Sequence, residues 1–272
     1  LGTLLSGTME TVRRIIRPDL IAYWRRMYQP RALVIACAGA LAPEAIERQV
    51  RQEWGAARGH AVKRFARAPR PRRSPQVRIW KKDTEQVHLC AGTYATARTH
   101  PDRFALELLH VMLGANMSSR LFREVREKRG LVYEVSTHIK RFADTGAFVI
   151  SAGCDPGKLS ATVQTVFAEL GRVRRGPISQ AELRRAKDYY AGQLQMGLED
   201  TMDHMLWMGE QAVTMGRVSN PDSVLSYIER VTVRDIQRVA RHLFVTERMH
   251  VAVVGPVAEA EGPRLTSLCR IS

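Results

Sequence analysis

Eight histidines are the first residues that could bind a metal ion or move protons. They stand at positions 60, 88, 100, 110, 138, 204, 242 and 250, and no two of them are four residues apart. A spacing of four residues lets two imidazoles on one helix face hold one zinc ion. Because no two histidines have this spacing, the chain contains no H-x-x-E-H or similar helical zinc motif. His110, which ends an apolar helical pattern, is therefore expected to pack in or on a helix rather than to bind a metal.

The four cysteines are far apart and form no C-x-x-C pair. Cys37 and Cys90 stand in the apolar, strand-like runs LVIACAG and VHLCAG. Free cysteine behaves as a small apolar residue, and isolated positions favour neither a disulfide framework nor a zinc site. We expect small, buried and reduced thiols.

A charged segment that ends at Gly130 could bind polar groups of a ligand. Four arginines recur every three residues along it: Arg120, Arg123, Arg126 and Arg129. Such a row is typical of a solvated helix face, on which Glu124 and Glu127 are expected to pair with the arginines. Tyr133 follows in a strand-like run, where aromatic residues are common. Taken alone, the segment indicates an exposed helix and an ordinary strand.

The elements that position these residues follow from capping, turn and periodicity signals. Helices are expected at 18–28, 43–55, 101–112, 118–129, 158–173, 202–215 and 233–244, with a further long helix after Ser179. Strands are expected at 32–38, 76–82, 86–94, 132–142, 147–154 and 249–254. Ser179 and Glu182 predict a capping box, and Gly130 fits the position after a helix end.

The composition indicates a globular chain with one basic linker. The chain has 272 residues, of which 45% are apolar, and a formal net charge of +15. Residues 59–75, GHAVKRFARAPRPRRSP, hold six Lys or Arg, three prolines and no acid, which is typical of a linker. The remaining charge is expected to be solvated surface or a surface suited to acidic partners.

No run of 18 apolar residues and no signal peptide is present in the sequence. No membrane span is therefore expected, and a cytoplasmic location is favoured. The sequence starts with Leu1 rather than Met, so the native N-terminus is expected to lie elsewhere.

The end of the chain repeats its beginning. When Asp19 is aligned with Asp235, an offset of 216 residues, the two segments match without a gap as far as Gly39 and Gly255. Both predict a helix, an apolar strand and a glycine. The second copy closes a unit that begins near Gln76, so the first copy is expected to close a preceding unit of which only the last part is present. Its strand should lack neighbours, and its helices should expose apolar faces.

The run at 116–135, NMSSRLFREVREKRGLVYEV, resembles the second, catalytically inert half of insulinase- and pitrilysin-type zinc peptidases. These are the inverzincins, and they include mitochondrial processing peptidase. The opening LGTLLSGTMETVRRIIRPDLIAYWRRMYQP and the DTGAF turn at 144–148 resemble the same family, so the resemblance spans nearly the whole chain. It implies an α/β fold, an α+β sandwich with a mostly antiparallel sheet covered by helices.

The same resemblance implies which residues act. The family carries H-x-x-E-H in its first half, whereas the corresponding helix here reads LELLH, with Leu106 and Leu109 replacing a ligand and the general base. No metal ligand or cofactor is expected in this chain, and zinc is expected in the full-length enzyme or a partner subunit. The family pairs an arginine with a tyrosine seven residues later, and Arg126 and Tyr133 hold that spacing. The resemblance implies that they bind substrate and stabilise the oxyanion across a clam-shell cleft.

The expected domains are a remnant of the first, zinc-bearing repeat (1–58), the basic linker (59–75) and a complete second, non-zinc domain (76–272). The resemblance implies that the chain is the C-terminal part of a zinc metalloendopeptidase that acts on peptides or unfolded polypeptides. The chain alone, without the N-terminal domain, is expected to be inactive. The alternative is a non-catalytic partner of a zinc-bearing subunit in a heterodimeric peptidase. A basic nucleic-acid-binding module is a further alternative that rests on charge alone, and the sequence shows no recognition fold for it.

Overall fold

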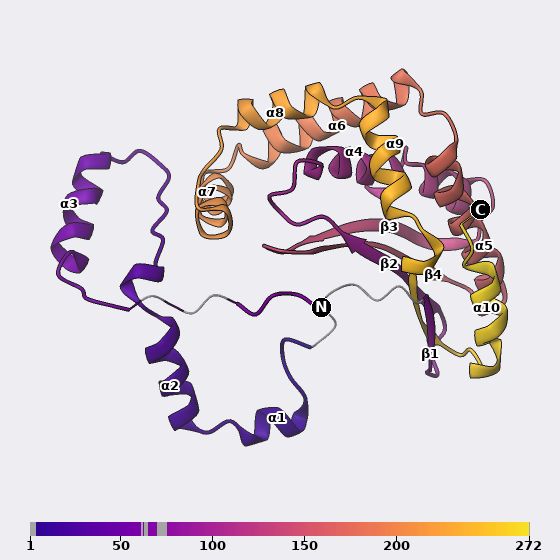
Figure 1. Cartoon of the computed structure of the whole chain (residues 1–272), viewed down its shortest axis with the longest axis horizontal. Coiled ribbons are helices and arrows are strands. Elements are labelled where there is room, and N and C mark those ends of the chain that lie inside the picture. The colour runs from indigo at the N-terminus through magenta and orange to yellow at the C-terminus, as the bar shows by residue number, and fades with distance from the viewer. Residues whose placement is uncertain (1–3, 61, 63–64, 70–74, 272) are drawn as a thin grey trace. The chain divides into compact units, whose positions relative to one another are not determined.

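The computed structural model describes residues 4–60, 62, 65–69 and 75–271. The chain forms two compact units (Figure 1): unit 1 comprises Leu1–Ala68 and Gly197–Val218, and unit 2 comprises Pro69–Met196 and Ser219–Ser272. Within the predicted linker, residues 61, 63–64 and 70–74 lie outside the described residues. The predicted domains were defined by the internal repeat, whereas these two units are defined by their compactness. The predicted domain boundaries therefore remain predictions.

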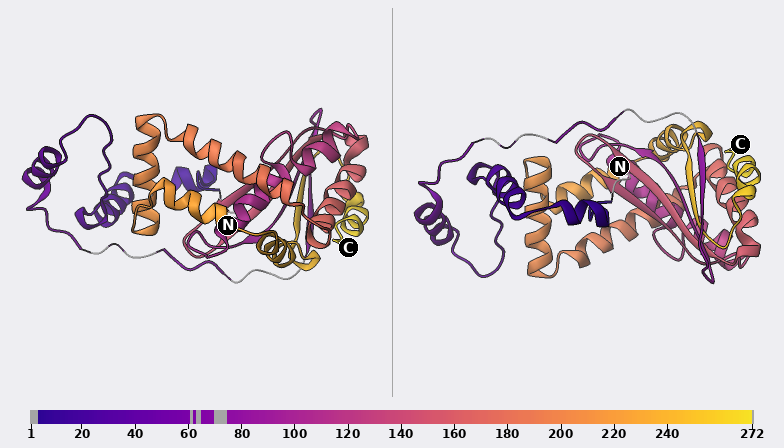
Figure 2. Two further views of the ribbon diagram at one scale, coloured as in Figure 1. Left: turned by 90° about the horizontal axis from the view of Figure 1, so that it is seen from above. Right: turned by 90° about the horizontal axis from the view of Figure 1, so that it is seen from below.

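Unit 2 is built on a five-stranded sheet in the order β1-β5-β2-β4-β3. Its strands are β1 (Gln76–Lys81), β2 (Val87–Ala95), β3 (Val132–Arg141), β4 (Gly146–Cys154) and β5 (His250–Gly255). Only β1 and β5 pair in parallel, and the other neighbours are antiparallel. The predicted, mostly antiparallel sheet is confirmed. In Figures 1 and 2, β3 and β4 run side by side as a long hairpin.

Helices cover one face of this sheet, and Figure 1 shows α4 and α9 lying over it. The helices of unit 2 are α4 (Arg103–Gly114), η2 (Phe122–Glu127), η3 (Pro156–Lys158), α5 (Leu159–Arg175), α6 (Gln180–Gly197), α8 (Pro221–Arg230), α9 (Val233–Leu243), η4 (Thr246–Arg248), η5 (Glu259–Glu261) and α10 (Gly262–Leu268). No helix in the described part of the chain is long and apolar enough to cross a membrane.

The strand β2 shows why the helices lie on one side. Val87, Leu89 and Ala91 are buried, whereas the intervening His88 and Cys90 are exposed. This period of two directs alternate side chains into the core under the helices and leaves the opposite sheet face open. The core itself is filled by large apolar side chains such as Phe148, which meets Phe244 edge-on at a centroid distance of 5.5 Å.

Unit 1 contains α1 (Met9–Arg14), α2 (Arg17–Met27), η1 (Pro30–Ala32), α3 (Pro43–Trp54) and α7 (Thr201–Met215). No residue of α1, α2 or α3 is buried. The prediction that the first copy exposes apolar faces is thus confirmed. Leu20, Trp24 and Tyr28, for example, are 59%, 59% and 64% exposed.

The predicted buried strand at 32–38 is wrong. Residues 33–38 form no strand, and Leu33, Val34 and Ile35 are 45%, 44% and 53% exposed. Isolated extended segments are unstable because their backbone groups need neighbouring strands for hydrogen bonds, and unit 1 has no strand among the described residues. The segment lies instead beside α7, where a Cβ atom added to Gly209 would stand 3.3 Å from the Cβ of Ala36.

The end of unit 2 nevertheless repeats the backbone of unit 1 at the offset of 216 residues. The bounds of α9 are those of α2, and the bounds of η4 are those of η1, each shifted by this offset. Tyr28 and Phe244, which follow the two helices, have φ/ψ angles of −88°/75° and −89°/82°. Gly39 and Gly255 both have a positive φ, 139° and 155°. The repeat that the sequence predicts is therefore present in the local geometry.

The prediction for the cysteines is wrong for two of the four. All four are free, but only Cys154 and Cys269 are buried, while Cys37 and Cys90 are exposed. Cys90 lies on the open face of the sheet, and Cys37 lies in the segment that lacks neighbouring strands. Burial raises the pKa of the Cys269 thiol to about 12, so this group stays protonated at neutral pH.

Candidate functional site

The segment that carries Arg126 departs from a regular α-helix. In η2 the Lys128 N–H donates to the carbonyl of Arg123, five residues earlier, at 2.9 Å. The sequence predicted a regular helix over 118–129, so this π-helical turn is a correction. Such turns are rare and occur often at functional sites. Gly130 (φ 56°) ends the segment as predicted, and its N–H donates to the Arg126 carbonyl at 3.0 Å.

Tyr133 also occupies an irregular position. In the ladder between β3 and β4, Val132 faces Cys154 and Glu134 faces Gly153, so Tyr133 is the extra residue of a β-bulge. A bulge changes the direction of a side chain, and bulges are common next to active sites. Tyr133 is 58% exposed, whereas Val132 points into the core. β3 is also an edge strand of the sheet, so Tyr133 stands at an accessible border.

The guanidinium of Arg126 and the hydroxyl of Tyr133 are available to donate hydrogen bonds to a ligand. The guanidinium of Arg126 lies over the ring of Phe122, 4.8 Å from its centroid, which restrains the side chain through a cation–π contact. In the described part of the chain, neither the Arg126 guanidinium nor the Tyr133 hydroxyl has a hydrogen bond or an ion pair. η2 packs against β3. That both donors reach one substrate carbonyl remains a prediction.

The predicted ion pairs of the helix 118–129 are wrong. Glu124 pairs with Lys128, which the prediction did not include. Arg120 reaches across to α6, where its Nε and Nη2 each donate to a different carboxylate oxygen of Glu182 at 2.6 Å. This fork raises the pKa of Arg120 and is stronger than an exposed pair within one helix. It also corrects the predicted capping box. The Glu182 N–H donates to Ser179 Oγ at 3.1 Å, but the Glu182 carboxylate pairs with Arg120 and supplies no second half of the box.

The residues that the resemblance aligns with a zinc site do not fit zinc. Leu106 and Leu109 of α4 are 1% and 0% exposed and belong to the hydrophobic core. The Nδ1 atom of His110 lies 2.6 Å from Oγ1 of Thr137 on β3. Burial, with a smaller effect from the charge of His138, lowers the pKa of His110 to about 4. Among the described residues, no group of three or more His, Cys, Asp or Glu is placed to hold a metal ion.

Comparison with known proteins identifies the family of this chain. Residues 14–190 match the family described as "Peptidase M16 inactive domain". The chain belongs to the M16 peptidase family. This assignment agrees with the family that the sequence resembles.

Individual M16 relatives show the same relationship. An uncharacterized zinc protease of Streptomyces coelicolor is 35% identical over 271 residues, covering 97% of this chain and 59% of that protein. The mitochondrial-processing peptidase subunit beta of Dictyostelium discoideum is 28% identical over 270 residues, covering 95% of this chain and 57% of that protein. The crystal structure of a protease from Helicobacter pylori matches with a TM-score of 0.83 at 20% identity, covering 92% of this chain and 61% of that chain.

These comparisons confirm the predicted family and the predicted fold. The chain spans 59% of the Streptomyces relative and 57% of the Dictyostelium relative, so relatives of this M16 chain contain a substantial further region. The roles of Arg126 and Tyr133 remain predictions.

Proposed function

We propose that this chain supplies the substrate-binding half of a zinc endopeptidase, in which Arg126 and Tyr133 donate hydrogen bonds to the scissile carbonyl. Developing negative charge on that oxygen is stabilised by donors that are in place before the reaction. No group of described residues fits zinc, so the ion and the general base would come from the region outside this chain or from another subunit.

The observation that carries the proposal is the local geometry of the two residues. Each stands on an irregularity, a π-helical turn for Arg126 and a β-bulge for Tyr133. Irregular backbone is less stable than regular structure and persists where it serves a purpose. Here it presents two polar groups to solvent that have no partner among the described residues.

The substrate class proposed is an extended polypeptide. β3 is the last strand of the sheet, so one side of its backbone has no neighbouring strand in the described structure. Such an edge can bind a peptide as an added strand, with main-chain hydrogen bonds supplying affinity. Tyr133 lies at the start of this edge and Arg126 lies in the turn that leads into it.

The test is a pair of substitutions in the full-length protein, or in the complex with its zinc-bearing subunit. Arg126→Ala and Tyr133→Phe should each lower turnover of a fluorogenic peptide by about 100- to 1,000-fold, the range found for one oxyanion donor. For Tyr133→Phe the loss should lie mainly in kcat, because only the hydroxyl is removed and its bond forms in the transition state.

Matched controls are Arg129→Ala and Tyr227→Phe. Arg129 follows η2, and Tyr227 is an exposed tyrosine of α8 that stacks on Phe104. Both variants should keep full activity, and zinc content should be unchanged in all four. Peptide turnover that is equal in Arg126→Ala, Tyr133→Phe and the controls would contradict the proposed role.

The second candidate function is a non-catalytic partner subunit of a heterodimeric peptidase. It is favoured by the likeness to a relative that is named as one subunit of a processing peptidase. The complete gene decides between the two: an H-x-x-E-H motif about 110 residues before Leu1 supports a single-chain enzyme. Its absence, together with activity that appears only when a zinc-bearing subunit is added, supports the partner subunit.

A further inference from the structure

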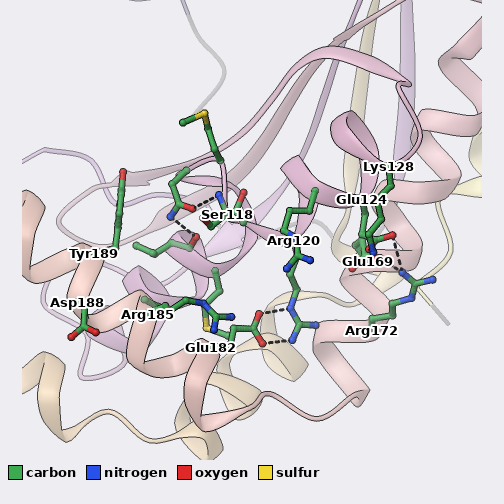
Figure 3. Close-up of a pocket in the computed structure, with 17 residues that line it drawn as sticks. Ser118, Arg120, Glu124, Lys128, Glu169, Arg172, Glu182, Arg185, Asp188 and Tyr189 are labelled. Carbon is green, nitrogen blue, oxygen red and sulfur yellow. Dashed lines mark hydrogen bonds and ion pairs between the residues drawn. The ribbon is translucent and has the colours of Figure 1, made fainter.

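A second site on unit 2 is independent of the role proposed for Arg126. A cavity of about 760 Å³ lies where the end of α4, η2, α5 and α6 meet (Figure 3). Its volume is in the range of small-molecule sites. Its lining is strongly charged, with five basic side chains (Arg120, Arg123, Lys128, Arg172 and Arg185) and four acidic ones (Glu124, Glu169, Glu182 and Asp188).

Each acidic side chain of the cavity lining already forms an ion pair with a basic side chain. Figure 3 shows the fork between Arg120 and Glu182, 2.6 Å for each of its two hydrogen bonds, and the pair between Arg172 and Glu169. The other two acids are also paired, Glu124 with Lys128 and Asp188 with Arg184. No carboxylate of the lining is therefore left to neutralise the other basic side chains of the lining.

Two guanidiniums of the lining are left over. Among the described residues, neither Arg123 nor Arg185 has an ion pair or a side-chain hydrogen bond. The two come from different elements, η2 and α6. A guanidinium presents parallel N–H groups that match the oxygens of a carboxylate or phosphate.

A buried hydroxyl provides an independent observation. Ser119 lines the cavity and is 2% exposed, and its Oγ has no hydrogen-bond partner among the described groups. A buried polar group without a partner destabilises the folded protein. A ligand oxygen in the cavity would accept a hydrogen bond from this hydroxyl.

We propose that this cavity binds a small oxyanion, carboxylate or phosphate, through the guanidiniums of Arg123 and Arg185 and the hydroxyl of Ser119. The fork between Arg120 and Glu182 joins the turn before η2 to α6, and Arg172 of α5 lies 3.8 Å from the carboxylate of Glu124 in η2. These ion pairs hold the three elements together around the site. Binding neutralises the like charges of Arg123 and Arg185 and gives the buried hydroxyl of Ser119 a hydrogen-bond partner.

The experiment is calorimetric titration of the 272-residue chain with two probes, inorganic pyrophosphate and citrate, at constant ionic strength set with NaCl. Saturable binding of at least one probe is expected. Binding of pyrophosphate alone identifies a phosphate site, binding of citrate alone identifies a carboxylate site, and binding of both identifies shared oxyanion recognition.

The variant Arg123→Gln/Arg185→Gln should weaken binding by at least about tenfold, and Ser119→Ala should weaken it by about threefold to tenfold, because charged hydrogen bonds are stronger than neutral ones. The variant Arg123→Lys/Arg185→Lys keeps the charge and loses the fork, so an intermediate affinity is expected. Thermal melting without ligand checks that each variant is folded.

The matched control is Arg234→Gln/Arg241→Gln, which removes the same charge from exposed positions of α9 outside the cavity. Its affinity should equal that of the unmodified chain. The proposal is overturned by absence of saturable binding for both probes. It is also overturned if the control loses as much affinity as the cavity variants, because the attraction then comes from the net charge of +15 alone.

Discussion

Residues 17–39 and 233–255, the first and second copies of the repeat, have the same local backbone and opposite surroundings. Both begin with a helix of the same length, continue through a short 3-10 turn and reach a glycine with positive φ. In the second copy Ile236, Val239 and Leu243 are buried, and β5 lies between β1 and β2. In the first copy no helical residue is buried and no strand forms.

This difference separates what a segment specifies by itself from what its neighbours supply. Helix ends, turns and φ angles are determined within a few residues, so they are the same in both copies. A strand depends on hydrogen bonds to adjacent strands, so it exists only in the second copy. The first copy therefore has the local geometry for a central strand position without the sheet that would surround it.

The largest expected effect compares the two glycines. A Cβ atom at Gly255 would lie 2.9 Å from the backbone Cα of Val87, whereas the nearest atoms at Gly39 are 3.9 Å away. Both positions have positive φ, so alanine is strained at both. Gly255→Ala adds a clash with the neighbouring strand and should lower the free energy of unfolding by about 3–5 kcal/mol. Gly39→Ala should cost about 1 kcal/mol.

Urea-dependent hydrogen exchange measures this difference, because amides of β2 and β5 report on unit 2 and amides of α2 report on the first copy. If the two alanine variants lose the same stability, close packing around Gly255 contributes nothing and the contrast between the copies is refuted.

A smaller effect is expected for the helix residues that align with each other. Ile236 is fully buried, and its counterpart Leu20 is 59% exposed. Ile236→Ala should destabilise unit 2 by about 2–4 kcal/mol, since it leaves a cavity in the core. Leu20→Ala should change stability by at most about 0.5 kcal/mol, as is usual at exposed positions. A cost for Leu20→Ala close to that of Ile236→Ala, again by hydrogen exchange, would show that the first copy is covered by another chain in solution.

The same contrast explains which features the sequence could predict. The strands of unit 2 were predicted correctly because their apolar alternation reflects a sheet that is actually present, as in β2. The capped helix α9 and the glycine after η2 were also correct, because they depend on neighbouring residues. The strand at 32–38 was wrong, since its apolar composition matches that of β5 while its partner strands are not among the described residues.

The candidate site divides in a similar way. The spacing of Arg126 and Tyr133 was visible in the sequence, but the π-helical turn and the β-bulge that present them were not, because both depend on packing against β4 and α5. The cavity around Ser119 was missed entirely. It depends on the pair between Arg120 and Glu182, which are 62 residues apart, and no local pattern predicts such a contact.

The smallest expected effect compares the two aspartates at the start of the helices. Asp235 accepts hydrogen bonds from the N–H and hydroxyl of Thr232, at 3.0 and 2.6 Å, and from Arg238 at 3.2 Å. Asp19 accepts a hydrogen bond from the N–H of Ile16 at 3.1 Å.

The hydrogen bonds from Thr232 lower the pKa of Asp235 below its ordinary value of 3.8. An acid with a lowered pKa stabilises the fold above its unfolded pKa, and this contribution is lost as the pH falls through the folded pKa. Asp235→Asn should therefore cost about 1 kcal/mol at pH 7 and progressively less below pH 3.8, whereas Asp19→Asn should cost about 0.3 kcal/mol. Chemical denaturation at pH 7 and at pH 2.5 measures both, and a penalty for Asp235→Asn that is independent of pH would show that the charge of Asp235 contributes nothing to the second copy.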